Sequence, residues 1–252
     1  MEEGKQEEIQ GRTELQVFLR DTHRSGFKKY QDLIVGSSNL LYLIKYEILT
    51  GFLGPLPGAL GFMLRGVFFK SLLGKVGSGV VFGRNITLRH PQKIYLGDNV
   101  IIDDYVVLDA KGENNKGIFI GSNVTIGRNS IISCKNGDLT VGDNVIIGSN
   151  SYVQSGRRVD IGKNVGIGAY CFIIGGGEHK ISRTDIPMLA QGQIIKDITI
   201  EENAMIGTGT KIKGGVTIGK DAFIGAGAMV TKSIPEFSIA VGVPAKVVRK
   251  RK

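Results

Sequence analysis

Several residue types are absent or scarce in this 252-residue chain, which has no tryptophan, 6 prolines, 2 cysteines and 3 histidines. The cysteines, Cys134 and Cys171, form no CxxC pair, so they predict neither a disulfide framework nor a zinc ribbon. We expect them to be reduced packing residues of a cytosolic protein. Three histidines spread over positions 23, 90 and 179 also argue against a metal enzyme, because a catalytic zinc needs several ligands that converge on one ion.

Long hydrophobic runs are missing as well. Residues 1–15 contain glutamates and no apolar core, so we expect no secretory signal peptide. The longest uncharged run, residues 48–64, contains Pro55 and Pro57 and is shorter than the roughly 20 residues that span a bilayer. The formal net charge is +9, but no basic helix or aromatic RNA-binding motif accompanies it, so nucleic acid is not an expected partner.

Four segments differ in composition. Residues 1–32 form a polar arm, and residues 33–75 read as two apolar helices joined at GPLPG. One interpretation places this second segment in a membrane interface, with Arg65, Lys70 and Lys75 near anionic headgroups. The other interpretation is a pair of helices that caps the repeat domain or packs between subunits. On the membrane interpretation, the helices expose a set of large apolar side chains: Leu40, Leu41, Ile44, Leu60, Phe62, Phe68, Phe69 and Leu72.

Glycine is abundant, with 37 residues, and regularly spaced Ile and Val indicate tight turns between short strands and not disorder. From Val76 an aliphatic or aromatic residue recurs every six positions in groups of three. Hexapeptide periodicity predicts a mainly β fold, a parallel β-helix of about seven triangular coils over residues 76–234. The groups are Val76, Phe82, Leu88; Leu96, Ile102, Leu108; Ile120, Ile126, Ile132; Val141, Ile147, Val153; Ile161, Ile167, Ile173; Ile200, Ile206, Ile212; and Ile218, Ile224, Val230.

Insertions interrupt the repeat only between the third member of one group and the first member of the next. If each group is one coil, all insertions fall at one corner of the prism, where binding features tend to collect. The longest insertion is loop 174–199, which begins IIGGGEHKIS and contains His179. The last segment, residues 235–252, is a basic tail.

The repeat, the stretch IGTGTKIKGGVTIGKDAFIGAGAMVTKSIP and the ending VGVPAKVVRKR resemble the hexapeptide-repeat acyltransferases. The resemblance implies a left-handed β-helix, a homotrimer with active sites between subunits, and acetyl-CoA as co-substrate. Residues 31–112 also resemble a subgroup associated with cell-surface glycan assembly. The resemblance therefore implies an O-acetyltransferase of polysaccharide biosynthesis that is cytoplasmic or peripheral on the inner face of the membrane.

Acyl transfer needs a base that accepts the proton of the nucleophile, and histidine suits that task near neutral pH. From the residues alone, His179 is either such a base or an ordinary surface histidine; the resemblance implies the base. The preceding glycines allow a backbone N–H to approach the thioester carbonyl. Glu178 and Asp160 are candidates for a carboxylate partner or substrate contact, and Asn150 for a substrate contact.

For the donor, the resemblance places Thr208 and Ala226 along the pantetheine arm, Thr231 and Lys232 further on, and Lys246 and Arg249 at the nucleotide phosphates. The alternative for the last two is a solvated basic tail. Met205 stands where the family frequently has tryptophan. Two other functions stay open: an N-acetyltransferase of an amino sugar nucleotide, and a non-catalytic β-helix scaffold.

Overall fold

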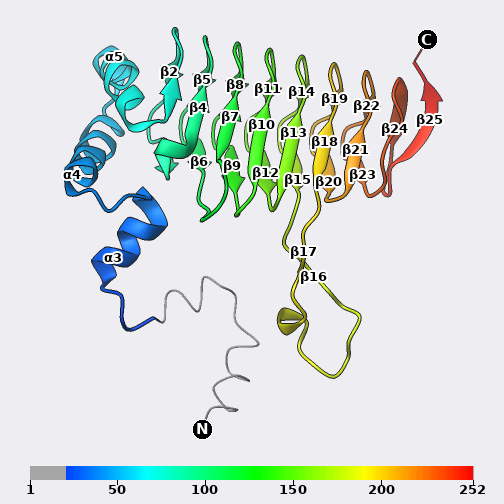
Figure 1. Cartoon of the computed structure of the whole chain (residues 1–252). Helices are drawn as coiled ribbons and strands as arrows, with labels where there is room; N and C mark the ends of the chain where they lie inside the picture. The colour runs from blue at the N-terminus through cyan, green and yellow to red at the C-terminus, as the bar shows by residue number, and fades with distance from the viewer. Residues whose placement is uncertain (1–20, 252) are drawn as a thin grey trace.

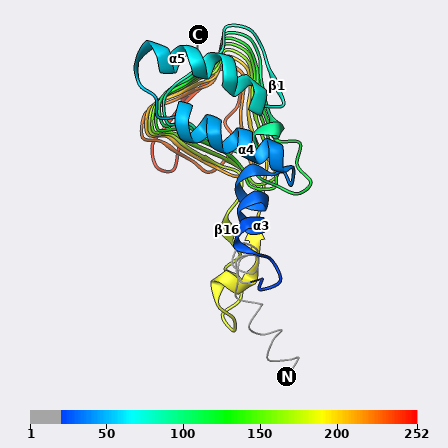
Figure 2. The ribbon, with the colours of Figure 1, turned by 90° about the vertical axis from the view of Figure 1, so that its left-hand side faces the viewer.

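The computed structural model describes residues 21–251, so the prediction about a signal peptide, which concerns residues 1–15, lies outside the described residues. Three sheets, parallel except for the last strand of one of them, form the sides of a long prism, and helices cover one of its ends (Figures 1 and 2). Each coil takes one strand from each sheet. Seven complete coils form in this way, and a further strand begins an eighth. The mainly β, left-handed β-helix fold predicted from the sequence is confirmed.

The strands of the prism are short and follow the repeat. Sheet A contains β1 (Lys75–Val76), β4 (Ile94–Leu96), β7 (Ile118–Ile120), β10 (Asp138–Val141), β13 (Arg158–Ile161), β18 (Ile198–Ile200) and β21 (Val216–Ile218). Sheet B contains β2 (Val81–Phe82), β5 (Ile101–Ile102), β8 (Thr125–Ile126), β11 (Ile146–Ile147), β14 (Gly166–Ile167), β19 (Met205–Ile206), β22 (Phe223–Ile224), β24 (Ser238–Val241) and β25 (Lys246–Lys250). Sheet C contains β3 (Thr87–Arg89), β6 (Val107–Asp109), β9 (Ile131–Cys134), β12 (Tyr152–Ser155), β15 (Phe172–Ile174), β20 (Lys211–Lys213) and β23 (Met229–Val230).

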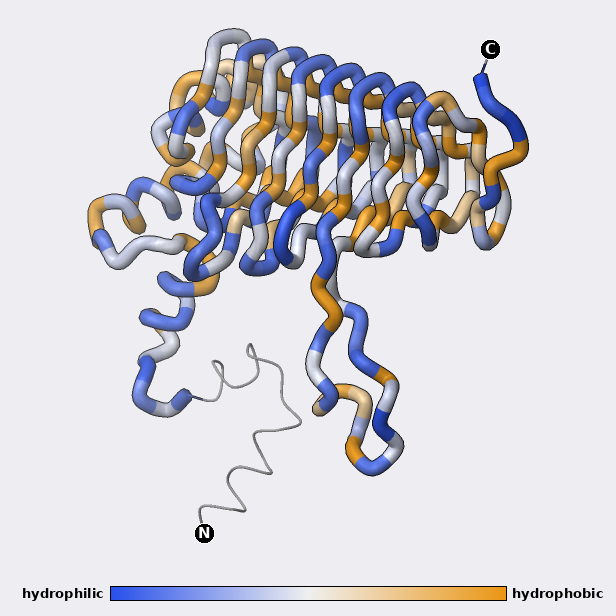
Figure 3. Tube along the Cα trace, turned by 45° about the vertical axis from the view of Figure 1, so that its right-hand side comes forward, coloured by the Kyte–Doolittle hydropathy of each residue, from blue (hydrophilic) through white to orange (hydrophobic). Residues whose placement is uncertain are grey.

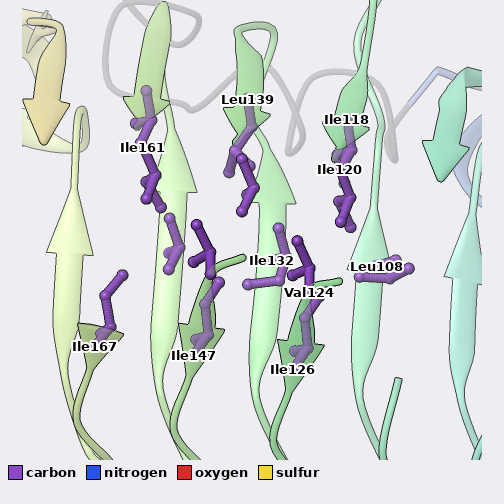
Figure 4. Packing of buried hydrophobic residues seen from close by; sticks show 14 of the residues in the cluster. Leu108, Ile118, Ile120, Val124, Ile126, Ile132, Leu139, Ile147, Ile161 and Ile167 are labelled. Carbon is purple, nitrogen blue, oxygen red and sulfur yellow. The ribbon is translucent and has the colours of Figure 1, made fainter. Parts of the chain in front are cut away.

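The residues that recur every six positions form the core of the prism. Every predicted core position from Phe82 to Val230 is at most 3% exposed, and Val76 is partly buried against the same cluster. Equivalent residues of neighbouring coils are paired in register, as Val141 is with Ile161. Figure 4 shows these side chains stacked inside the prism, and Figure 3 shows hydrophobic positions recurring in successive coils. Each such burial contributes about 1.5–3 kcal/mol, so stacking of coils stabilises the fold.

The corner between sheets A and B is stabilised by an asparagine ladder. Asn144 has a φ of 58°, a left-handed conformation that asparagine tolerates better than most residues. It accepts a hydrogen bond from Asn123 at 3.0 Å and donates one to Asn164 at 3.0 Å. The ladder thus connects successive coils outside the core.

We expect Asn144→Ala to lower the free energy of unfolding by about 1–2 kcal/mol, because it removes both ladder hydrogen bonds and places alanine, which tolerates a left-handed conformation less well than asparagine, in the turn. Asn144→Gly is the matched control, since glycine keeps the turn and loses only the hydrogen bonds. Urea denaturation followed by circular dichroism measures both variants. Equal losses in the two variants would contradict a contribution from backbone strain.

The N-terminal helices α4 (Leu40–Ile48) and α5 (Gly58–Phe68) cover the open end of the first coil (Figure 2). Phe69, in the short helix η3 (Phe69–Leu72), packs its ring 5.7 Å from that of Phe82. The Tyr46 hydroxyl donates to the Leu88 carbonyl at 2.8 Å. The two helices therefore cap the core, as one of the two interpretations of residues 33–75 expected.

Three details of the membrane interpretation were wrong. Phe69 and Leu72 are 0% and 1% exposed, because they fill the end of the prism and do not face outward. Arg65 is 4% exposed, and its guanidinium donates to the carbonyls of Phe82, Leu53 and Leu56. Burial lowers the pKa of Arg65, and the side chain holds the cap to the first coil, so it is not available to headgroups.

The outer face of the cap remains apolar. We call this set of exposed side chains the cap face. No helix within residues 21–251 is long and apolar enough to cross a membrane. The members of the cap face are between 46% and 79% exposed: Leu40, Leu41, Ile44, Ile48, Phe52, Leu60, Phe62, Met63, Val67 and Phe68.

Candidate active site

Loop 174–199 leaves the prism at the corner between sheets C and A, which we call the C–A edge (Figure 1). It connects β15 to β18 and contains β16 (Glu178–His179), the short helix η5 (Met188–Gln191) and β17 (Gln193–Ile194). Strands β16 and β17 pair antiparallel, with His179 opposite Gln193. The loop is therefore a hairpin-based arm, and His179 lies near its base.

The glycines at the base of this arm are held by the preceding coil. The Gln154 side-chain amide donates to the Gly176 carbonyl at 3.2 Å, and its oxygen accepts from the Tyr152 hydroxyl at 2.5 Å. Gly177 has a φ of 102°, a conformation that favours glycine. Sequence reasoning missed Gln154. Its position in the outward register of β12 was the only available signal, because nothing in the sequence shows that the arm folds over it.

His179 is partly buried, and its Nδ1 atom is sealed from solvent without a hydrogen-bond partner among residues 21–251. The two candidate carboxylates are engaged elsewhere. Asp160 pairs with Arg158 at 2.5 Å, and Glu178 pairs with Lys213 at 3.1 Å. Since a buried ring nitrogen normally has a partner, this atom is a point where a substrate, a water molecule or a second chain would complete the structure.

The other two histidines have different environments. His23 is exposed in the N-terminal arm. His90 is a structural clamp: its Nε2 donates to the Asp32 carbonyl at 2.9 Å, and its backbone N–H donates to the Ile34 carbonyl at 2.9 Å. Burial lowers the pKa of His90, so its neutral form is favoured. No cluster of three His, Cys, Asp or Glu side chains suited to a metal ion occurs in the described part of the chain.

The structure divides the expected substrate residues between two edges of the prism. Asn150, Thr208 and Ala226 lie at the corner between sheets B and C, which we call the B–C edge. They belong to the fourth, sixth and seventh coils. Thr231 and Lys232 follow β23 at the C–A edge, the edge that carries the arm with His179. One chain therefore does not bring these two groups together, because the width of sheet C separates them.

Lys246 and Arg249 belong to a strand and not to a loose tail. Strand β25 pairs antiparallel with β24, with Lys246 opposite Val241 and Arg249 opposite Ile239. The register shifts between Ile239 and Ala240, which is a β-bulge. Cross-strand partners share a face, and Ile239 and Val241 lie two residues apart on one face. The bulge thus places both cations on the outer face of sheet B.

A shallow cavity of about 360 Å³ lies at the foot of the arm, on the outer side of sheet A. The guanidinium of Arg157 makes a two-point ion pair with Asp197 at its rim, with contacts of 2.7 and 2.5 Å. This pair fixes the returning strand of the arm to the preceding coil. The other residues that line the cavity are Ile195, Lys196, Thr199, Gly215, Val216 and Thr217.

Comparison with known families agrees with this architecture. The family described as "Bacterial transferase hexapeptide (six repeats)" matches residues 197–232. The family described as "Hexapeptide repeat of succinyl-transferase" matches residues 117–155 and 138–173. These matched residues lie within the coils, and over them the chain is similar to hexapeptide-repeat transferases.

Individual relatives are named as acetyltransferases. A probable acetyltransferase of Mycobacterium tuberculosis is 34% identical over 52% of this chain and 44% of its own length. A putative acetyltransferase of Staphylococcus aureus is 38% identical over 44% of this chain and 64% of its own length. The chain thus matches about half to two thirds of these relatives' lengths. Among solved structures, the polySia-specific acetyltransferase NeuO is similar, with 26% identity, a TM-score of 0.54, and coverage of 71% of this chain and 82% of that one.

Proposed function

We propose that this protein is an acetyl-CoA-dependent O-acetyltransferase that acts on a hydroxyl group of a sugar or glycan precursor, with His179 as general base. The observation that carries the proposal is the sealed, unpartnered Nδ1 of His179 at the base of the arm, within the part of the chain that the structure describes. A buried polar atom without a partner is costly, and such atoms cluster at catalytic sites. The names of the relatives and of NeuO support the reaction and a glycan acceptor.

In the proposed reaction, the imidazole of His179 takes the proton of the acceptor hydroxyl while the hydroxyl oxygen bonds to the acyl carbon of the thioester. The carbon–sulfur bond then breaks, and the imidazolium returns the proton to the departing thiolate of coenzyme A. Gln154 is a positioning residue, since it fixes the Gly176 carbonyl and with it the turn that leads to His179. A backbone N–H of that turn is the proposed donor to the oxyanion.

The active form we propose is a homotrimer with each site between two copies. The substrate residues lie on two separate edges, so the arm of one copy would meet the B–C edge of the next. An apolar row on the outer face of sheet B gives such contacts a surface, because exposed apolar area of this kind is usually covered. The row includes Ile101, Ile146, Met205 and Phe223.

The donor in this proposal lies along the last coils. Thr208 and Ala226 line its pantetheine arm on the B–C edge, and Lys246 and Arg249 meet its phosphates on the outer face of sheet B. Thr231 and Lys232 of the C–A edge approach it from the other copy. Arginine and lysine are chemically suited to phosphate, and the bulge presents both on one face.

We expect Lys246→Ala combined with Arg249→Ala to raise the KM for acetyl-CoA by about tenfold to a hundredfold and to change kcat little, because phosphate contacts stabilise ground and transition states alike. Lys250→Ala is the matched control, since Lys250 is opposite the buried Ser238 and faces the other side of the strand. Steady-state kinetics with varied acetyl-CoA measures the effect. A KM within twofold of the parent would contradict the phosphate role.

A membrane location completes the proposal. The cap face would rest on the inner surface of the membrane, with Lys70 and Lys75 near anionic headgroups, each contributing about 1 kcal/mol. This attachment would bring the enzyme close to a lipid-linked glycan precursor. We place the reaction accordingly in cell-surface polysaccharide assembly.

The test of the proposed function is a screen in which the purified protein, acetyl-CoA and a panel of sugars and glycan precursors are followed by mass spectrometry. An added acetyl group that is stable to hydroxylamine would indicate an amide and favour the N-acetyltransferase. Calorimetry with acetyl-CoA separates both enzymes from the scaffold. Absence of any coenzyme A binding would overturn the enzyme proposal.

A further inference from the structure

The B–C edge turns at one left-handed residue in each coil. Asparagine and glycine adopt this conformation readily, whereas a bulky side chain is strained there. Two of the seven positions hold tyrosine. The turn residues, with φ between 54° and 73°, are Asn85, Tyr105, Asn129, Asn150, Tyr170, Gly209 and Gly227.

The two tyrosines differ in their surroundings. Tyr105 contacts Arg84, whose guanidinium lies 5.8 Å from the ring centroid and donates to the hydroxyl at 3.4 Å. The side chain of Tyr170 has no hydrogen bond or ring contact with any residue from 21 to 251 and is 57% exposed. A strained backbone conformation that no side-chain contact compensates is typical of a residue at a ligand-binding site.

The turn positions of the two coils that follow Tyr170 are glycines, Gly209 and Gly227, which carry no side chain. A Cβ atom added at Gly227 would meet nothing within 4 Å, and one added at Gly209 would come no nearer than 3.9 Å to another atom. Tyr170 occupies the turn position of the coil before Gly209, and its backbone N–H donates to the Ser149 carbonyl of the preceding coil. The edge is therefore open over two coils, and the coil before them has an exposed tyrosine at the same turn position.

This open stretch runs beside Thr208 and Ala226. The coils pack closely here: a Cβ added at Gly207 would lie 2.5 Å from the Ala226 nitrogen, and one added at Gly168 would lie 2.6 Å from the Thr208 nitrogen. Neighbouring coils are about 4.8 Å apart, so Tyr170 is one step beyond Thr208. A pantetheine arm that passes Ala226 and then Thr208 would deliver its thioester to Tyr170.

We propose that Tyr170 is a specificity-determining residue whose ring closes the acyl end of the donor track and restricts the donor to acetyl-CoA. The inference rests on the proposed function, because it takes the donor path from it. Each additional methylene of a longer acyl group would meet the ring. A pocket wall of this kind discriminates by about tenfold or more for each methylene.

The experiment is calorimetry of the full chain with coenzyme A, acetyl-CoA and butyryl-CoA, which needs no acceptor. We expect the parent protein to bind butyryl-CoA, which has two more methylenes, at least about a hundredfold more weakly than acetyl-CoA. Tyr170→Asn should remove that difference and leave binding of coenzyme A unchanged. Its Tm should be unchanged or higher, because asparagine relieves the strained turn, and a purely structural tyrosine would not give this combination.

Tyr105→Asn is the matched control, since it makes the same substitution at the same edge three coils away, and it should leave the acyl preference intact. Equal binding of the two acyl donors by the parent would overturn the proposal, as would an unchanged preference in Tyr170→Asn. Loss of the oligomer in that variant would assign the ring to a subunit contact and also overturn it. If the parent binds none of the three compounds, the proposed function itself fails.

Discussion

His179→Ala should lower kcat by about two to four orders of magnitude, the range expected when a general base is removed. The Kd for acetyl-CoA should stay nearly the same, because in the proposal other residues hold the donor and the imidazole of His179 acts on the proton of the acceptor. Steady-state kinetics on an acceptor found by the mass-spectrometric screen, together with calorimetry, measures both quantities. A large loss of kcat with intact donor binding would separate a role in the chemical step from a role in folding.

His23→Ala is the matched control, since His23 is an exposed histidine of the N-terminal arm. It should behave like the parent protein. His90→Ala would be a poor control, because it removes the side-chain hydrogen bond of the clamp to the Asp32 carbonyl. If His179→Ala retained most of the parent's kcat, the assignment of the base would have to be abandoned.

The sequence was most informative where one physical rule repeats. Phe82, Ile102 and Ile126 occupy the same inward position in successive coils, and a spacing of six suffices to predict that position without knowledge of any distant contact. The corner insertions could also be predicted, because an insertion between two groups does not change the spacing of six within the following group. Periodicity therefore predicted the fold class and the edge from which the arm leaves.

Contacts between unrelated segments could not be predicted in this way. The membrane interpretation placed Arg65 near anionic headgroups, whereas its guanidinium donates to three carbonyl groups beneath the cap. Gln154 and the bulge in β25 were missed for a similar reason. Their roles depend on which strand folds over them, and that pairing follows from the tertiary structure and not from local spacing.

Only part of the candidate site could be predicted from the sequence. The arm and His179 stand out because they interrupt a regular repeat, and the resemblance to a known family added the chemistry. The division of the substrate residues between the C–A and B–C edges was not predictable from a list of motifs, because positions within one hexapeptide unit say nothing about which edges of two copies meet. That division is the structural reason for proposing a site between subunits.

Flotation with anionic vesicles should separate the parent protein from a variant with a polar cap face. We expect most of the parent to float with vesicles of phosphatidylcholine and phosphatidylglycerol. The variant Leu41→Gln, Phe52→Gln, Leu60→Gln, Met63→Gln should remain with the soluble fraction, because it removes four of the five most exposed apolar side chains of the cap face, which are 63–79% exposed. Glutamine has nearly the helix propensity of leucine and methionine, so α4 and α5 should be retained.

Removal of the whole segment would be a misleading version of this experiment, since it would expose Phe82 and the end of the core that Phe69 covers. The matched control is Val243→Gln with Val248→Gln, which changes two side chains, 72% and 58% exposed, at the opposite end of the prism. That control should float as the parent does. If the parent stays soluble with anionic vesicles, the cap face does not bind membrane, and the placement of the acceptor on a lipid loses its physical basis. If parent and cap variant float equally, the attachment lies elsewhere in the chain, and the apolar cap face must be assigned to contact with another protein surface.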